Sequence, residues 1–161
     1  MASFRRRKLP DPGSRAPDFH LARLEGGQTP LAQIAADGPA LLVFFKVTCP
    51  VCQMTLPYLD RIHAAGLPVY GVSQDDAADT RDFMREFGVG FPMLLDREED
   101  NYPVSNAYEI SSVPTMFLVE RDGTIAQVIE GWRKADIERL GAMAGVAAIR
   151  PGDRVPEWKA G

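Results

Sequence analysis

The chain alternates between short apolar runs and segments of helical periodicity, and this alternation predicts the order of its elements. Residues 40–46, ALLVFFK, form a continuous apolar run with β-branched and aromatic side chains, which is typical of a strand buried on both faces. Residues 50–65 place their apolar side chains on one side of a helix. The pattern further predicts strands within residues 67–73, 91–96, 115–120 and 124–130, helices over 76–87 and 134–147, and a weaker helix between 101 and 109.

Turn residues show which strands pair directly. Gly26 and Gly27 separate two short strand-like segments and predict a hairpin near the start of the chain. Arg121, Asp122 and Gly123 separate two stronger ones and predict a second hairpin near the end. Strand and helix alternate between the hairpins, as in parallel βαβ units. We therefore expect an α/β fold with three α/β/α layers and a mixed sheet, in which a parallel part is joined by a C-terminal antiparallel hairpin and an N-terminal hairpin extension.

The chain length predicts one domain with terminal extensions. A chain of 161 residues can bury roughly 70% of the surface that its unfolded form exposes, so it needs no disulfide or metal for stability. Residues 1–16 are basic and rich in proline, glycine and arginine, and we expect a flexible tail. The folded domain is expected over residues 17–147, and residues 148–161 are expected to form a C-terminal tail.

Composition narrows the class of partner. With 45% hydrophobic residues, 25% charged residues and a net charge of −4, the chain has no general attraction to nucleic acid or to an anionic membrane. The basic residues Arg5, Arg6, Arg7 and Lys8 are not followed by an apolar run of signal-peptide length, and no stretch approaches the ~20 apolar residues of a membrane span. We expect a cytoplasmic protein that binds proteins or small molecules, with no nucleic-acid or membrane partner.

Both cysteines of the chain lie in the stretch KVTCPVCQMTLP, at the junction of the buried strand and the following helix. Pro50 is favoured at the first helical position, which makes Cys49 the expected N-cap. Free backbone N–H groups and the positive end of the helix dipole would then favour the thiolate of Cys49. Cys52 is almost one turn further on, so Cys49 can attack a disulfide and Cys52 can resolve the mixed disulfide.

Other uses of the two sulfurs are possible. A zinc site needs about four ligands, and the chain offers only His20 and His63 besides the cysteines, so we expect no metal. A structural disulfide between Cys49 and Cys52 would close too small a loop to remove much unfolded-state entropy. An inert disulfide or a pair of buried thiols remains an alternative at this stage.

Several motifs occur in an order that resembles the thioredoxin superfamily. CPVC after a buried strand and SSVPT far downstream, with APDFHL, YGVSQDD and VPTMFLVERDG, is most similar to the redoxin branch. That branch includes TlpA/ResA-like thiol-disulfide oxidoreductases and AhpC/TSA-related peroxiredoxins. The resemblance covers about residues 16–146 and implies a thioredoxin-like version of the predicted fold. It also implies that Cys49 is the exposed nucleophile and Cys52 the buried resolving thiol.

The resemblance also implies a substrate-binding face around Cys49. Val113 and Pro114 resemble the pair at the cis-proline of the family, where the backbone of Val113 can hydrogen-bond an extended substrate. Thr48, Pro50 and Val51, which adjoin the cysteines, are the other residues expected to contact substrate.

The chain departs from the family pattern beside Cys49. Many relatives have tryptophan where this chain has Thr48, and thioredoxins bury an aspartate where it has Val43. Lys46 is a candidate to lower the pKa of Cys49 through its charge. Val51 has no side-chain donor for the thiolate, which predicts less thiolate stabilisation than a histidine there would give and therefore a pair that leans toward acting as a reductant.

The expected function is therefore reduction of disulfides without a cofactor. The substrate would be a disulfide-containing protein or a small thiol compound, and a thioredoxin- or glutathione-type reductant would restore the dithiol of a monomer or weak dimer. One alternative is a redoxin-type peroxide reductase, although neither cysteine has the proline seven residues and the threonine three residues before it that such enzymes use. The other is a non-catalytic redox-sensing or docking module.

Overall fold

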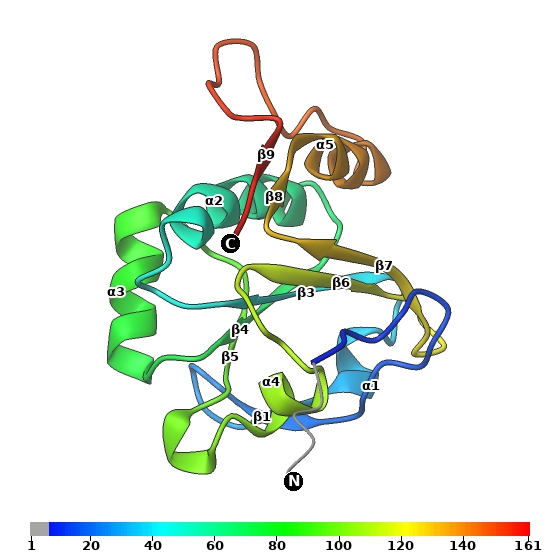
Figure 1. Ribbon diagram of the computed structural model, residues 1–161, viewed down its shortest axis with the longest axis vertical. Coiled ribbons are helices and arrows are strands. Elements are labelled where there is room, and N and C mark those ends of the chain that lie inside the picture. The colour runs from blue at the N-terminus through cyan, green and yellow to red at the C-terminus, as the bar shows by residue number, and fades with distance from the viewer. Residues whose placement is uncertain (1–6) are drawn as a thin grey trace, which may run out of the picture.

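A seven-stranded mixed sheet forms the centre of the computed structural model, which describes residues 7–161 (Figure 1). The strands follow the order β2-β1-β5-β4-β3-β6-β7 across the sheet. Their bounds are β1 (His20–Arg23), β2 (Gln28–Pro30), β3 (Ala40–Phe45), β4 (Val69–Ser73), β5 (Met93–Leu95), β6 (Thr115–Val119) and β7 (Ile125–Glu130). The helices are α1 (Leu31–Ile34), α2 (Pro50–Ala64), α3 (Ala77–Phe87), α4 (Pro103–Ala107) and α5 (Lys134–Met143).

Strand directions confirm the predicted mixed sheet. The strands β3, β4 and β5 are parallel neighbours, whereas β6 and β7 form the C-terminal antiparallel hairpin and β1 and β2 the N-terminal one. β6 also pairs antiparallel with β3, and β1 with β5, which joins both hairpins to the parallel part. The three-layer α/β/α arrangement is thioredoxin-like.

β3 is the central strand, and its alternating side chains build both halves of the core. Every residue from Ala40 to Phe45 has no exposed surface. Leu41, Val43 and Phe45 face one apolar cluster, and Leu42 and Phe44 face the other. A strand buried on both faces in this way has no polar side, which explains its continuous apolar run.

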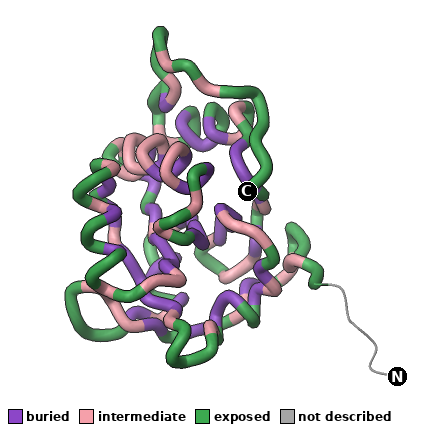
Figure 2. Tube along the Cα trace, turned by 60° about the vertical axis from the view of Figure 1, so that its left-hand side comes forward, coloured by how far each residue is buried: buried purple, intermediate pink, exposed green. Residues whose placement is uncertain are grey.

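The helices divide between the two faces of the sheet (Figure 1). Buried residues of α2, α3 and α5 join the cluster of Val43, and those of α1 and α4 join the cluster of Phe44. Asp76 caps the start of α3 and Gly88 ends it with a positive φ of 66°. Figure 2 shows the buried residues concentrated in the interior of the fold, with exposed residues on its outer segments.

The N-terminal prediction is wrong for part of the first 16 residues. Gly13 donates its N–H to the Ile125 carbonyl at 2.8 Å, and Ala16 donates to the Gly123 carbonyl at 2.9 Å. Backbone pairing with the start of β7 therefore holds this stretch, which sequence composition alone does not show. Arg5 and Arg6 lie outside the described residues.

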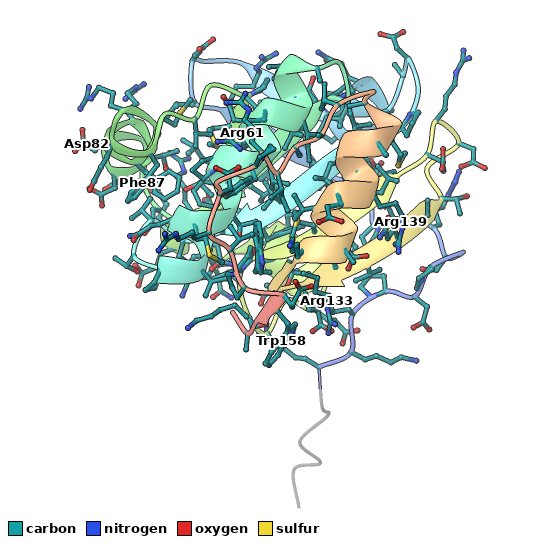
Figure 3. All side chains as sticks on the ribbon, turned by 90° about the horizontal axis from the view of Figure 1, so that it is seen from above. Arg61, Asp82, Phe87, Arg133, Arg139 and Trp158 are labelled. Atoms are coloured by element: carbon teal, nitrogen blue, oxygen red, sulfur yellow. The ribbon has the colours of Figure 1, made fainter. Side chains whose placement is uncertain are left out.

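The C-terminal stretch is also more than a tail. Two short strands, β8 (Trp132–Arg133) and β9 (Trp158–Lys159), pair antiparallel, so that residues 155–161 return toward the sheet. The indole N–H of Trp132 donates to the Pro156 carbonyl at 2.6 Å. Arg61 of α2, labelled in Figure 3, donates to the Ala148 carbonyl at 2.9 Å, which holds the start of the C-terminal stretch against α2.

The two tryptophans have opposite environments. Trp132 is fully buried, and its ring packs edge-on to Tyr58 at a centroid distance of 5.2 Å. Trp158, the first residue of β9, is 56% exposed (Figure 3). Trp132 is thus a packing residue of the core, whereas Trp158 is not.

Within residues 7–161, no helix has the length and apolar character that crossing a membrane requires.

Candidate active site

The sulfur of Cys49 caps the first turn of α2. Cys49 has extended backbone angles, φ −82° and ψ 115°, and Pro50 follows as the first helical residue. The backbone N–H of Cys52 donates to the Cys49 sulfur at 3.2 Å. This is the predicted N-cap, with sulfur in the place that a serine or aspartate oxygen usually takes.

These donors make Cys49 acidic. Its pKa is lowered to about 6, chiefly by the side-chain hydrogen bond from Cys52 and then by the backbone N–H groups of Cys52 and Val51, against an opposing effect of burial. Roughly 90% of Cys49 is then thiolate at pH 7, compared with a few per cent for an ordinary cysteine. Because the residue is only partly buried, this thiolate remains accessible to a substrate.

Cys52 has the opposite properties. It has no exposed surface, and burial is the main cause that raises its pKa, followed by the hydrogen bond with Cys49 and the negative charges of Cys49 and Asp75. Cys52 is therefore a buried, protonated thiol, and the partly exposed Cys49 beside it is ionised. This difference matches the separate roles that helix-start geometry predicted for the two cysteines.

The loop before β6 brings a distant segment to the sulfur. The Val113–Pro114 peptide bond is cis, and the Cys49 sulfur lies 3.5 Å from the Val113 carbonyl oxygen, to which only the protonated form of Cys49 can donate a hydrogen bond. The carbonyl of Pro114 accepts from the N–H of Gly131, so the other side of the loop is held by β7 and the turn after it. Val113 thus presents backbone directly beside the nucleophile.

The other predicted site residues differ in how far their side chains are exposed around Cys49. Thr48 and Pro50 are exposed around Cys49, where a substrate can contact them. Val51 is 7% exposed and belongs to the core, so its side chain is not part of that surface. Its contribution is a backbone N–H, which does not depend on the valine side chain, so the comparison with a histidine at this position stays a prediction. Lys46 is exposed, but the causes of the lowered pKa of Cys49 do not include its charge.

Asp75 is a site residue that sequence reasoning missed. No local pattern in the sequence connects Asp75 with the cysteines, although it follows β4, the parallel neighbour of β3. Its carboxylate accepts the N–H of Val47 at 2.8 Å, in the loop that leads to Cys49, and its charge raises the pKa of Cys52. The signal that was available is the meeting of adjacent parallel strands at their carboxyl ends.

Among residues 7–161, no group of three or more His, Cys, Asp or Glu side chains is arranged to hold a metal ion. The chemistry of the described site rests on the two sulfurs and on the protein groups around them.

The fold and the cysteine pair define a thioredoxin-like protein with a CxxC redox centre. A model of the AhpC/TSA family matches residues 12–128, and the chain belongs to this family.

Curated relatives agree with this assignment. The chain is 32% identical over 133 residues to the thiol-disulfide oxidoreductase ResA of Geobacillus kaustophilus, which covers 79% of this chain and 74% of the relative. It is 29% identical over 124 residues to ResA of Bacillus subtilis, covering 74% and 67% of the two chains. With the CxxC geometry, these similarities place the protein among the thiol-disulfide oxidoreductases.

Solved structures share the fold. The thioredoxin domain of a thiol-disulfide oxidoreductase from Bacteroides vulgatus matches with a TM-score of 0.72 and 26% identity, over 81% of this chain and 94% of that one. A thiol:disulfide interchange protein of the thioredoxin family from Chlorobium tepidum matches with a TM-score of 0.67 over 84% and 97% of the two chains. At 23% identity, the second likeness concerns the fold alone.

Proposed function

We propose that this protein is a disulfide reductase whose Cys49–Cys52 dithiol reduces disulfides in protein substrates. One observation carries the proposal: a partly exposed, acidic Cys49 lies 3.5 Å from the Val113 carbonyl and directly above the buried Cys52. A nucleophile, a resolving thiol and a backbone position for docking are thus combined in one place.

In the first step the thiolate of Cys49 attacks one sulfur of the substrate disulfide. A Cys49–substrate disulfide forms, the substrate S–S bond breaks, and the second substrate sulfur leaves as a thiolate that takes a proton from solvent. The exposed Thr48 and Pro50 and the backbone of Val113 contact the substrate during this step.

In the second step Cys52 attacks the sulfur of Cys49. Its thiol must first lose a proton, and we assign this proton to Asp75, directly or through one water, because it is the carboxylate whose charge acts on Cys52. The Cys49–Cys52 disulfide forms and the substrate leaves as a second thiol. Two electrons have then passed from the protein to the substrate.

An external thiol reductant must restore the dithiol before the next turnover. Its class is the thioredoxin or glutathione type, since a second dithiol, or two equivalents of a small thiol, supply the two electrons. We expect the catalytic unit to be a monomer or a weak dimer.

Stopped-flow oxidation of the reduced protein by insulin and, separately, by hydrogen peroxide tests the proposal. We expect faster reaction with the protein disulfide, catalytic turnover in the presence of dithiothreitol, and no turnover with Cys49→Ser. Cys52→Ser should accumulate the mixed disulfide with insulin. Faster reaction with peroxide would instead make the protein a peroxide reductase, and a binding change without turnover would make it a sensor.

The direction of electron flow has its own measurement. A pKa of about 6 lies between the values of about 7 in thioredoxin and about 3.5 in the oxidant DsbA. We therefore expect a reduction potential below about −200 mV in glutathione buffers. A potential near the −120 mV of DsbA would contradict a reductase.

The cytoplasmic location remains a prediction. Fractionation of cells that carry the untagged protein checks it, and recovery from the membrane or from an extracytoplasmic fraction would contradict it.

A further inference from the structure

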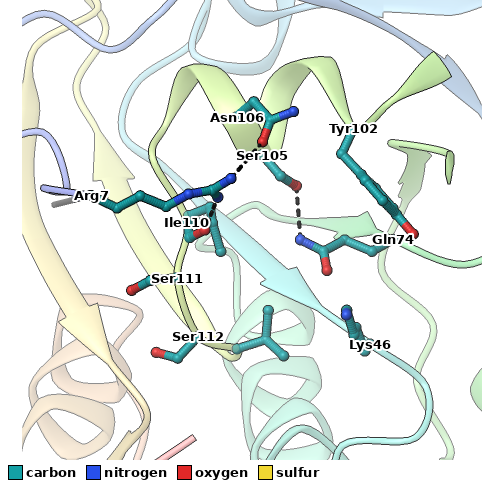
Figure 4. Close-up of a pocket in the computed structure, with 10 residues that line it drawn as sticks. Arg7, Lys46, Gln74, Tyr102, Ser105, Asn106, Ile110, Ser111 and Ser112 are labelled. Atoms are coloured by element: carbon teal, nitrogen blue, oxygen red, sulfur yellow. Dashed lines mark hydrogen bonds between the residues drawn. The ribbon is translucent and has the colours of Figure 1, made fainter. Parts of the chain in front are cut away.

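A pocket of about 250 Å³ lies beside the active-site loop (Figure 4). Its walls come from four parts of the chain: Lys46 follows β3, Gln74 follows β4, Ser105 and Asn106 belong to α4, and Ser111, Ser112 and Val113 lead to β6. Arg7 closes the pocket from the N-terminal side.

We propose that this pocket binds the carboxylate of a low-molecular-weight thiol or of its disulfide, and so holds a small anionic substrate for exchange at Cys49. The inference rests on the proposed function, since it concerns which thiol compound exchanges with the Cys49–Cys52 couple.

The charges of the pocket favour an anion. Arg7 and Lys46 are among its lining residues, and none of the ten lining residues is acidic. The guanidinium of Arg7 donates to the Ile110 carbonyl at 2.5 Å and to the Asn106 side chain at 3.1 Å. These two bonds fix the arginine at the wall and leave further N–H groups of its five for a ligand. Figure 4 shows this arginine and Lys46 on opposite sides of the cavity.

Polar neutral groups complete the lining. The amide of Gln74 donates to the Ser105 hydroxyl at 2.9 Å, which leaves the amide oxygen and one N–H of the glutamine available. Acidic side chains gather instead in an adjacent hollow, where Asp75, Asp76 and Glu98 lie beyond Gln74 and Tyr102. The pocket that contains Arg7 and Lys46 therefore favours an anion, and the adjacent hollow with the acidic side chains favours a cation.

Val113 connects the pocket with the nucleophile. It lines the pocket, and its carbonyl oxygen is 3.5 Å from the Cys49 sulfur. A compound that fills the pocket and touches Val113 therefore lies against the residue whose carbonyl oxygen contacts the Cys49 sulfur.

The C-terminal residue Gly161 partly covers the Val113 carbonyl. Gly161 lies so close that a Cβ at this position would be 2.7 Å from the Val113 carbonyl carbon and would overlap the oxygen. An extended polypeptide that pairs with Val113 must displace residues 158–161, whereas a small compound in the pocket need not. Small compounds in the pocket can therefore react without this rearrangement, whereas a protein substrate that docks on Val113 requires it.

The exchange at Cys49 balances without any other reactant. Two thiols RSH and the Cys49–Cys52 disulfide give RSSR and the dithiol: RS⁻ first attacks the Cys49 sulfur and Cys52 leaves, and a second RS⁻ then attacks the R sulfur and releases Cys49. Protons pass between the thiols and solvent. The reverse reaction oxidises the reduced protein through the same Cys49–S–S–R mixed disulfide.

Three symmetrical disulfides of similar size test the pocket: 3,3′-dithiodipropionate with two carboxylates, cystamine with two ammonium groups, and neutral bis(2-hydroxyethyl) disulfide. Each rate of oxidation of the reduced protein is divided by the rate with free 2-mercaptoethanol, which removes intrinsic reactivity. At low salt we expect the corrected rate of the dicarboxylate to exceed that of the neutral disulfide by about tenfold, and the advantage to shrink in 0.5 M salt because charges are screened. Equal corrected rates, or a preference for cystamine, would overturn the proposal.

Variants separate the pocket from a general effect on the thiolate. Arg7→Gln combined with Lys46→Gln should slow the dicarboxylate much more than the neutral disulfide, so that the anionic preference falls to about one. Lys8→Gln removes a positive charge next to Arg7 that pairs with Asp11 outside the pocket, and it should keep the preference. If the double variant reacts more slowly with all three disulfides by the same factor, the substitutions act on Cys49 itself, and the proposed carboxylate site would be refuted. If insulin too reacts no faster with the reduced protein than with free 2-mercaptoethanol, the proposed function itself fails.

Discussion

The sulfur of Cys49 and the carbonyl oxygen of Val113 lie 3.5 Å apart, although 64 residues separate them in the chain. The contact exists because β3 and β6 are antiparallel neighbours, so that the end of one strand and the start of the other share an edge of the sheet. Cys49, which follows β3, and Val113, which precedes β6, are therefore positioned by two paired and buried strands.

The acidity of Cys49 should depend on the Cys52 side chain. Cys52→Ala removes the first cause of the lowered pKa, and we expect the apparent pKa of Cys49 to rise from about 6 toward the ordinary cysteine value. Its reactivity at pH 7 should fall several-fold and recover at alkaline pH. The pH profile of iodoacetamide alkylation measures this change.

Cys52→Ser is the matched control, because its hydroxyl can still donate to Cys49 and both backbone N–H donors remain. Its alkylation profile should shift less than that of Cys52→Ala. Identical profiles for wild type and Cys52→Ala would show that the backbone donors alone set the acidity.

Removing the charge of Asp75 should slow the second chemical step. Asp75→Asn keeps an oxygen for the N–H of Val47 but cannot accept a proton. We expect the first attack on insulin to be unchanged and the release of reduced product to slow by about tenfold or more. Quenched-flow measurement of the mixed disulfide follows the two steps separately. Asp76→Asn, which retains the cap of α3, should leave both steps near wild type, and the same behaviour for Asp75→Asn would refute its role.

A methyl group at Gly71 should disturb the core beside β3. A Cβ there would overlap the Met93 sulfur and lie 3.0 Å from the Phe45 ring. We expect Gly71→Ala to lower the free energy of unfolding by about 1–3 kcal/mol in urea. At Gly90 the nearest atom to an added Cβ is an Asp60 oxygen at 3.6 Å, so Gly90→Ala should change stability by less than about 0.5 kcal/mol. Equal losses would contradict the packing argument.

The indole N–H of Trp132 should hold the C-terminal segment. Trp132→Phe removes the donor to Pro156 and should cost about 1–3 kcal/mol of unfolding free energy. Trypsin should then cut faster after Arg154. Trp158→Phe changes an exposed ring and should leave both measurements near wild type. Unchanged cleavage in Trp132→Phe would show that β8–β9 pairing alone holds the segment.

Local sequence patterns predicted the fold because they coincide with its strongest requirements. The continuous apolar run of β3 reflects burial on both faces, and Asp76 and Gly88 mark the ends of α3 through backbone geometry that each residue satisfies alone. Cys49 before Pro50 defines an N-cap in the same local way.

The parts of the site that were missed depend on neighbours far apart in the chain. Asp75 reaches the cysteine loop only because β3 and β4 are parallel, and Arg7 reaches α4 only because the N-terminal stretch lies against the sheet. No periodicity in either segment signals these contacts. Gly161 is a third case, since its approach to Val113 requires the return of the chain through β9.

That return has a practical consequence for experiments on this protein. A purification tag or fluorescent fusion joined after Gly161 would emerge beside the Val113 carbonyl, in the space that an incoming disulfide needs. Such a fusion would block access or pull residues 158–161 away, and either effect would alter the measured rates. The position of the tag therefore belongs among the variables of every kinetic assay.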